Sequence, residues 1–212
     1  MFRSIFRPYG LVWTVLNTIT DVVGLTLCWL LCCLPIVTVF PATAALYDAV
    51  VHGIRYREEG PYKRFFRTFR AEWKSGILST LLWGAVLGFF GYLLAVLLTM
   101  ARQDSGFSLY AGIYLAGMFL PIGAACWSAA IISRFTFSFL ALTGTAVRFV
   151  IAHFFRSLGI AACTVALAVF TWNYPIWIFA APACLMLLWS VFAEPVFAKY
   201  GAAITPVTPD ED

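Results

Sequence analysis

Residues 28–47 read CWLLCCLPIVTVFPATAALY, an uncharged apolar stretch that contains two prolines, Pro35 and Pro41. A soluble core does not need an apolar run of this length, which is close to what a membrane-spanning helix requires. Inside hydrocarbon, each proline frees a backbone carbonyl that only neighbouring protein or trapped water can satisfy. The stretch therefore predicts where the chain enters a membrane and also where its backbone becomes irregular.

The composition of the whole chain agrees with this interpretation. Of 212 residues, 62% are apolar and 11% are charged, and the mean hydropathy is +0.89. A soluble globular domain carries about 25% charged residues. We therefore expect an all-α polytopic transmembrane bundle, with residues 1–212 forming a single integral membrane domain. The net charge of +4 is explained by basic loops on one side of the membrane rather than by nucleic acid, which we do not expect as a partner.

The hydropathy pattern predicts about five spans. The first apolar block covers residues 11–51, and as one straight helix it would extend about 60 Å, twice the thickness of the hydrocarbon core. It must therefore bend, and Pro35 and Pro41 mark the places for a break. Pro195 marks the expected end of the last span. The remaining spans are expected at residues 76–100, 108–133, 157–173 and 175–194.

The distribution of cations predicts the orientation. The connection between the first two spans carries seven of them: Arg55, Arg57, Lys63, Arg64, Arg67, Arg70 and Lys74. By the positive-inside rule, the two long connections and the C-terminus are cytoplasmic. Arg3 and Arg7 leave two alternatives open. They lie outside if the first block crosses once, and inside if that block enters the membrane and returns through its break.

The long connections also contain amphipathic patterns. Residues 61–74, PYKRFFRTFRAEWK, predict a helix with an aromatic face and with cations around it. Such a helix lies at the surface of a membrane with anionic lipids, or it docks a cytoplasmic partner. Residues 145–156 are a weaker version of the same pattern. Candidate docking residues are Lys63, Arg64, Arg67, Arg70, Lys74 and Arg134.

An internal repeat is a further hypothesis. Leu34-Pro35-Ile36 and Leu120-Pro121-Ile122 recur 86 residues apart, and each leads into a basic amphipathic stretch and then a span. Two parallel units, at about 11–100 and 108–173, followed by a final helix at 175–194, would account for this order.

The most specific strings are Trp-Leu-Leu-Cys-Cys-Leu-Pro-Ile-Val-Thr from residue 29 and Pro-Ala-Thr-Ala-Ala-Leu-Tyr from residue 41. Together with the basic aromatic stretch from Phe65 to Trp73 and with Ser133-Arg134-Phe135, they resemble the YesL family of bacterial integral membrane proteins. The resemblance implies a bacterial cell membrane location and an association with carbohydrate uptake and sugar ABC-transporter permeases. It implies no established activity.

Polar residues inside the apolar blocks are candidate functional groups because their burial in a membrane is costly. Asn17 and Asp21 lie four residues apart on one predicted helix face. Thr38 and Thr43 could supply hydroxyl groups at the break, where Thr43 could also cap a helix that starts after Pro41. These four residues are either a substrate or proton site at mid-membrane or ordinary helix-packing groups.

Two charged positions near the predicted ends of spans have similar alternatives. Asp48 and His52 form either a charge-paired helix end or a proton relay. Glu194 is expected either to snorkel toward the interface or to pair with a cytoplasmic arginine, and Arg134 could be that partner or could bind a lipid phosphate.

The sequence contains no known catalytic fingerprint, so we expect neither an enzyme nor a cofactor, and we assign no catalytic residue and no metal site. Two functions remain. The first is an accessory or regulatory component of a sugar-transport complex. The second is a small secondary transporter with a midplane site at the Pro35–Pro41 break.

Overall fold

The computed structural model describes residues 11–103, 106–135 and 139–200, with side chains from Leu16 onward. All regular structure in these ranges is helical. Five helical segments are long and apolar enough to cross a membrane, which confirms the predicted all-α class with about five spans. They are Ile36–Arg55, Trp73–Gln103, Phe107–Ile132, Phe154–Asn173 and Ala181–Lys199.

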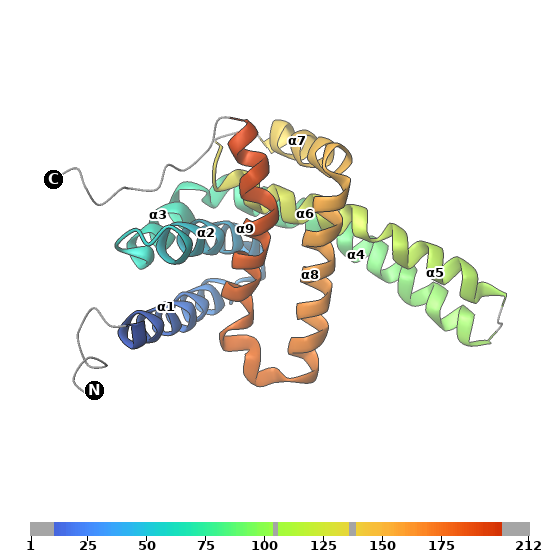
Figure 1. Cartoon of the computed structure of the whole chain (residues 1–212). Coiled ribbons are helices and arrows are strands. Elements are labelled where there is room, and N and C mark those ends of the chain that lie inside the picture. Colours follow the sequence, from blue (N-terminus) through green and yellow to red (C-terminus); the bar gives the residue numbers. More distant parts are fainter. Residues whose placement is uncertain (1–10, 104–105, 136–138, 201–212) are drawn as a thin grey trace.

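The first apolar block is a hairpin. Helix α1 (Leu11–Cys32) and helix α2 (Val39–Val50) lie side by side, joined by a short 3-10 helix, η2 (Ile36–Thr38) (Figure 1). The block therefore bends, as expected, but at Pro35 alone. Pro41 is the third residue of α2, in the first turn, where a helix does not use the backbone N–H that proline lacks. The break therefore ends before Pro41, and the expectation that the helix starts after Pro41 is wrong.

The two open ends of the hairpin lie together. Tyr62, at the start of helix α3 (Pro61–Ala71), donates a hydrogen bond to the carbonyl oxygen of Thr20 in α1 over 3.5 Å. Since α3 follows α2 through a π-helical segment, η3 (Val51–Arg55), α1 starts at the end of the hairpin where α2 finishes. The block thus folds back on itself. Arg3 and Arg7 lie outside the described residues.

The rest of the chain forms two further hairpins (Figure 1). Helix α4 (Trp73–Gln103) pairs with α5 (Phe107–Gly117), which continues through Met118 into α6 (Phe119–Ile132). After α7 (Phe139–Ala152), helix α8 (Phe154–Asn173) pairs with α9 (Ala181–Lys199) across the 3-10 helix η4 (Pro175–Phe179).

Three predicted boundaries are wrong. The helix expected at 61–74 ends at Ala71, so Lys74 belongs to α4. The stretch 145–156 is interrupted at His153, between α7 and α8. The last helix continues through Pro195 to Lys199, because one proline removes a single helical hydrogen bond and kinks a helix without always ending it.

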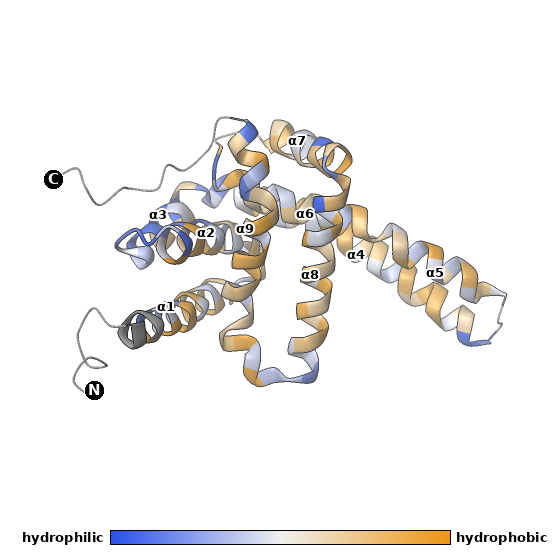
Figure 2. Cartoon of the chain, in the orientation of Figure 1, coloured by the Kyte–Doolittle hydropathy of each residue, from blue (hydrophilic) through white to orange (hydrophobic). Residues whose placement is uncertain are grey.

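Burial is uneven among the helices. In the most apolar 18-residue stretch of Ile36–Arg55, 72% of the residues are buried. In the corresponding stretch of α4 only 6% are buried. Helices α2 and α6 therefore form the centre, and the α4–α5 hairpin extends away from it (Figure 1). Figure 2 shows that the residues of this hairpin are largely hydrophobic, while hydrophilic residues gather around α3. An apolar surface of this kind suits contact with lipid.

Four tryptophans form hydrogen bonds between neighbouring helices through their indole N–H groups. Each donates a hydrogen bond to a hydroxyl oxygen on another helix: Trp29 to Thr43 (3.2 Å), Trp83 to Ser128 (3.0 Å), Trp127 to Ser157 (2.8 Å) and Trp189 to Thr164 (3.0 Å). Such bonds satisfy the one polar group of a large apolar ring and add to the packing between helices.

The two units of the predicted repeat have the same order of packing. Helix α2 packs against α3 and α4, and α6 packs against α7 and α8. The two Leu-Pro-Ile tripeptides are not equivalent, however, since Pro35 lies in the break before α2, whereas Pro121 lies inside the first turn of α6. In that respect Pro121 resembles Pro41. The repeat itself stays a prediction.

Substitution of Gly76 and of Gly84, both in α4, tests the contact between α4 and α2. A Cβ atom at Gly76 would lie 2.6 Å from Cβ of Pro41, whereas one at Gly84 would meet no atom within 4 Å. We expect Gly76→Ala to lower the free energy of unfolding by about 1–3 kcal/mol through overpacking. Gly84→Ala removes a glycine from the same helix and should be neutral or stabilising by up to about 1 kcal/mol. Thermal unfolding in detergent measures both, and equal melting temperatures would contradict this packing.

Candidate functional site

Charged side chains gather at the end of the bundle where η3, α3, α9 and the segment after α6 meet. We call this group the ionic cluster. Its side chains connect parts of the chain that are far apart in sequence, and all of them are at least two-thirds buried. Its members are Asp48, His52, Glu58, Arg64, Arg134 and Glu194.

Asp48 holds α3 against α2. Its Oδ2 accepts hydrogen bonds from Nε of Arg64 over 3.0 Å and from the hydroxyl group of Thr68 over 2.6 Å. The side chain of Asp48 is 5% exposed. Arg64 also donates from Nη1 to Glu58 over 2.7 Å. Because a buried carboxylate must be paired, these bonds fix which face of α3 turns inward.

His52 lies between the two arginines of the cluster. Its Nε2 is 2.7 Å from Nη2 of Arg64 and 3.1 Å from Nη1 of Arg134. Guanidinium groups only donate hydrogen bonds, so Nε2 must accept. Nδ1 lies 3.0 Å from Oδ1 of Asp48. The hydrogen-bond network thus assigns His52 as the neutral tautomer with its proton on Nδ1.

Arg134 and Glu194 form a further ion pair of the cluster, with 2.7 Å between Nη2 and Oε1. Each side chain is only 6% exposed. Oε1 of Glu194 also accepts a hydrogen bond from the hydroxyl group of Tyr47 over 3.0 Å, and the Arg134 guanidinium lies over the Tyr47 ring at 5.9 Å. The predicted partnership of Glu194 with Arg134 is confirmed, as is the contact between Asp48 and His52.

The balance of charges decides what the cluster can do. Its three carboxylates face two arginines, and a third, Arg55, donates to Ser190 of α9 nearby over 2.7 Å. Among the described polar atoms of the cluster, Nε of Arg134 is buried without a hydrogen-bond partner. A compensated network of this kind joins helices and specifies their arrangement. Apart from Nε of Arg134, the charged groups of the cluster are bonded to one another.

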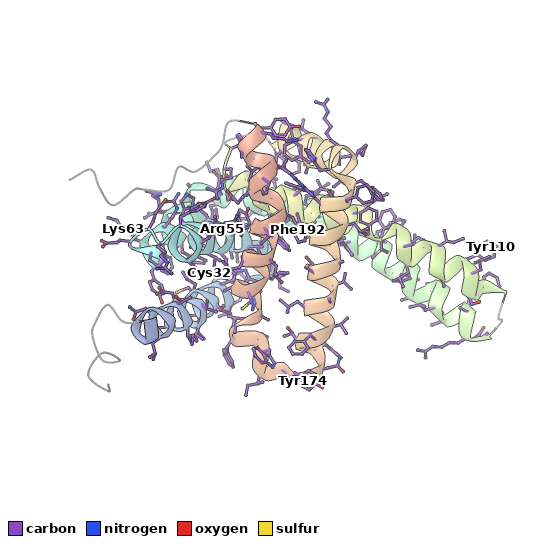
Figure 3. All side chains as sticks on the ribbon, viewed as in Figure 1. Cys32, Arg55, Lys63, Tyr110, Tyr174 and Phe192 are labelled. Carbon is purple, nitrogen blue, oxygen red and sulfur yellow. The ribbon has the colours of Figure 1, made fainter. Side chains whose placement is uncertain are left out.

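The candidate docking residues divide into two groups. Arg64 and Arg134 are bonded inside the ionic cluster, so they are not available to a partner or a lipid. Lys63, Arg67, Arg70 and Lys74 are exposed, and Lys63 points away from the bundle (Figure 3).

Partial burial of Tyr62, together with the nearby Asp21 carboxylate, raises the pKa of that tyrosine.

The aromatic face that was predicted over residues 61–74 is also divided between α3 and the start of α4. Phe65 is fully buried, while Phe66 and Trp73 are 52% and 43% exposed. The exposed aromatic rings and cations line an open groove of about 940 Å³. We call it the basic groove, and its lining residues are Phe66, Arg67, Phe69, Arg70, Ala71, Trp73, Lys74 and Ser75.

The four residues considered for a site at the break lie in two separate places. The hydroxyl group of Thr38 donates to the backbone carbonyls of Cys32 and Pro35, and that of Thr43 donates to Val39 within α2. Helix α2 starts at Val39, so Thr43 does not cap it. Asn17 and Asp21 lie in the first half of α1; Asp21 is eleven residues before Cys32, or about 16 Å along the helix.

Sequence analysis missed Glu58, Thr68 and Tyr47 and gave Arg64 a different role. Thr68 and Tyr47 complete the bonds of Asp48 and Glu194, and Arg64 points inward rather than outward. Arg64 and Thr68 are four residues apart and lie on the same side of α3 as Phe65, and this spacing indicated that they share the inner face of the helix. Among the described residues, no group of three or more His, Cys, Asp or Glu could hold a metal ion.

A double-mutant cycle on Arg134 and Glu194 tests the cluster. We expect Arg134→Met to cost about 3–5 kcal/mol of stability, because Glu194 then stays buried without its cation. The double variant Arg134→Met/Glu194→Met removes both charges and should recover much of this loss. Thermal unfolding of the four proteins in the same detergent measures the coupling. If the two single effects simply add, the ion pair does not exist in the folded protein.

Comparison with known families adds one finding. Residues 22–97 match the model of a family described as "Protein of unknown function, DUF624". The match covers about a third of the chain, from the second half of α1 through the break, α2 and α3 into α4. No curated protein and no solved structure matches the chain. The chain is thus similar, over its first hairpin, α3 and most of α4, to a family without an assigned activity.

Proposed function

We propose that this chain is an accessory or regulatory component of the bacterial cell membrane that docks a cytoplasmic partner through the basic groove. The observation that carries the proposal is the division of α3. Its inner side is fastened by the bonds of Arg64 and Thr68 to Asp48, and its outer side presents cations and aromatic rings. A helix that is held in place on one side and exposes cations and aromatic rings on the other is suited to bind a partner.

The distribution of charge supports a cytoplasmic position for this groove. The exposed cations Lys63, Arg67, Arg70 and Lys74 all lie close to the membrane-spanning α4. Positive residues near the ends of spans accumulate on the cytoplasmic side. The same argument puts the described end of α9, at Lys199, on that side.

The chemistry of the groove indicates an acidic partner. Each exposed Lys or Arg near an anionic surface contributes about 1 kcal/mol of attraction, and exposed aromatic rings such as Phe66 and Trp73 add apolar contact area. Anionic lipid headgroups satisfy the cations alone. An acidic, partly apolar segment of a protein satisfies both cations and rings.

The proposed link to carbohydrate uptake rests on the resemblance of residues 29–47 to the YesL family, and it indicates a sugar ABC-transporter permease as the partner. A transport site at the break has less support. The threonine hydroxyls there are engaged with backbone carbonyls, and Asp21 lies beside Tyr62 at the opposite end of the hairpin.

The test replaces the exposed cations of the groove and leaves the ionic cluster intact. We expect Arg67→Gln/Arg70→Gln/Lys74→Gln to abolish co-purification of a sugar permease from mild detergent and to lower sugar uptake by the host. The readouts are mass spectrometry of the eluate and uptake of labelled sugar.

The matched control removes the same charge from exposed positions outside the groove, with Arg57→Gln/Arg148→Gln/Lys199→Gln. This variant should keep both the partner and the uptake. Equal loss in the two triple variants would indicate general attraction to the membrane surface, and unchanged behaviour of the first variant would refute docking through the groove.

A further inference from the structure

A large apolar cavity lies at the end of the bundle opposite the ionic cluster. It is an open space of about 920 Å³ lined by residues of α1, α2, α4, α6, α8, η4 and α9. Its walls include Trp29, Cys33 and Phe40 beside the Pro35 break, and Cys126 and Ala129 of the central helix α6. The volume falls within the range of about 300–1,000 Å³ that is usual for ligand sites.

The polar atoms of the cavity wall are already bonded inside the protein. The three threonines that line it, Thr43, Thr164 and Thr171, each donate to a carbonyl in their own helix. The indole groups of Trp29 and Trp189 donate to Thr43 and Thr164. None of the residues found to line the cavity is charged. A sugar or an ion would therefore lose its hydrogen bonds to water without gaining others.

Neither water nor vacuum fills such a space favourably. Water against apolar walls finds few hydrogen-bond partners, and walls left without any neighbour lose their dispersion contacts. The walls belong to helices that are long and apolar enough to cross a membrane. The material in which they lie is thus the hydrocarbon of lipid chains.

The residues at the edge of the cavity are of the kind found at a membrane interface. Trp172 and Pro175 line the cavity at the turn between α8 and α9, and Trp172 is 88% exposed. Tyr174 lies at the tip of this hairpin (Figure 3), and Trp177 follows it, 50% exposed. Exposed Trp and Tyr side chains gather at the level of lipid headgroups, so one edge of the cavity lies at that level and the rest lies deeper.

We propose that this cavity is a lipid-binding site that takes an acyl chain of a glycerophospholipid, with the headgroup beside Trp172. The chain lies against the break at Pro35 and fills the space between α1 and the α8–α9 hairpin. This site is separate from the basic groove and does not depend on the docking function.

The test uses the full chain in nanodiscs that contain a phosphatidylcholine with a photoactivatable diazirine in its acyl chain. After irradiation, mass spectrometry maps the cross-linked residues. We expect labelling to be concentrated on cavity residues such as Cys126 and Leu185. Equal or weaker labelling there than on the lipid-facing surface around Gly84 would overturn the proposal, whether another protein segment or nothing fills the cavity.

A pair of variants on one helix sharpens the result. Ala168 lines the cavity, whereas Ala166 is exposed two residues earlier and is not part of the wall. Ala168→Phe should abolish most of the cross-linking at Cys126 and Leu185, and Ala166→Phe should leave it unchanged. If the two variants label alike, no lipid chain occupies this cavity.

Discussion

The convergence of Arg64 and Arg134 on His52, with Asp48 and Glu194 as counterions, is the constraint on which the rest of the structure depends. Charges that are 5–6% exposed in an apolar bundle are stable only when they are paired. The pairs join α2 to α3, and the segment after α6 to α9. Removal of any one element would leave a buried charge uncompensated, so the helices can meet at this end of the bundle in one arrangement only.

That constraint separates the two faces of α3 and thereby defines the surface that we propose for docking. Arg64 and Thr68 are used inside, which turns Arg67 and Arg70 outward. The opposite end of the bundle has the reverse character. There the chain turns at Pro35, the hydroxyl groups are bonded to tryptophans or backbone, and an apolar cavity remains. The basic groove at one end and the apolar cavity at the other would allow the protein to bind a partner and a lipid acyl chain at the same time.

Hydropathy predicted the class and the spans because apolar length is a property of each segment by itself. It also predicted the bend at Pro35, since 40 apolar residues cannot cross the hydrocarbon core as one straight helix. The orientation of Arg64 could not be predicted, because the sequence does not say which helix packs against α3. For the same reason Pro41 and Pro195 were assigned to helix ends, although both lie inside helices. The contact of His52 with Arg134 joins residues 82 positions apart, and no local pattern encodes it.

The most direct test of this account is the protonation of His52 at neutral pH. The chain has only two histidines, His52 and His153, so nitrogen-15 NMR of histidine-labelled protein in detergent gives two ring systems, and His153→Gln assigns them. The two guanidinium donors at Nε2 predict a neutral His52 ring with a protonated Nδ1 and a bare, hydrogen-bond-accepting Nε2. A proton on Nε2, in either the other neutral tautomer or the imidazolium form, would contradict the arrangement of the ionic cluster.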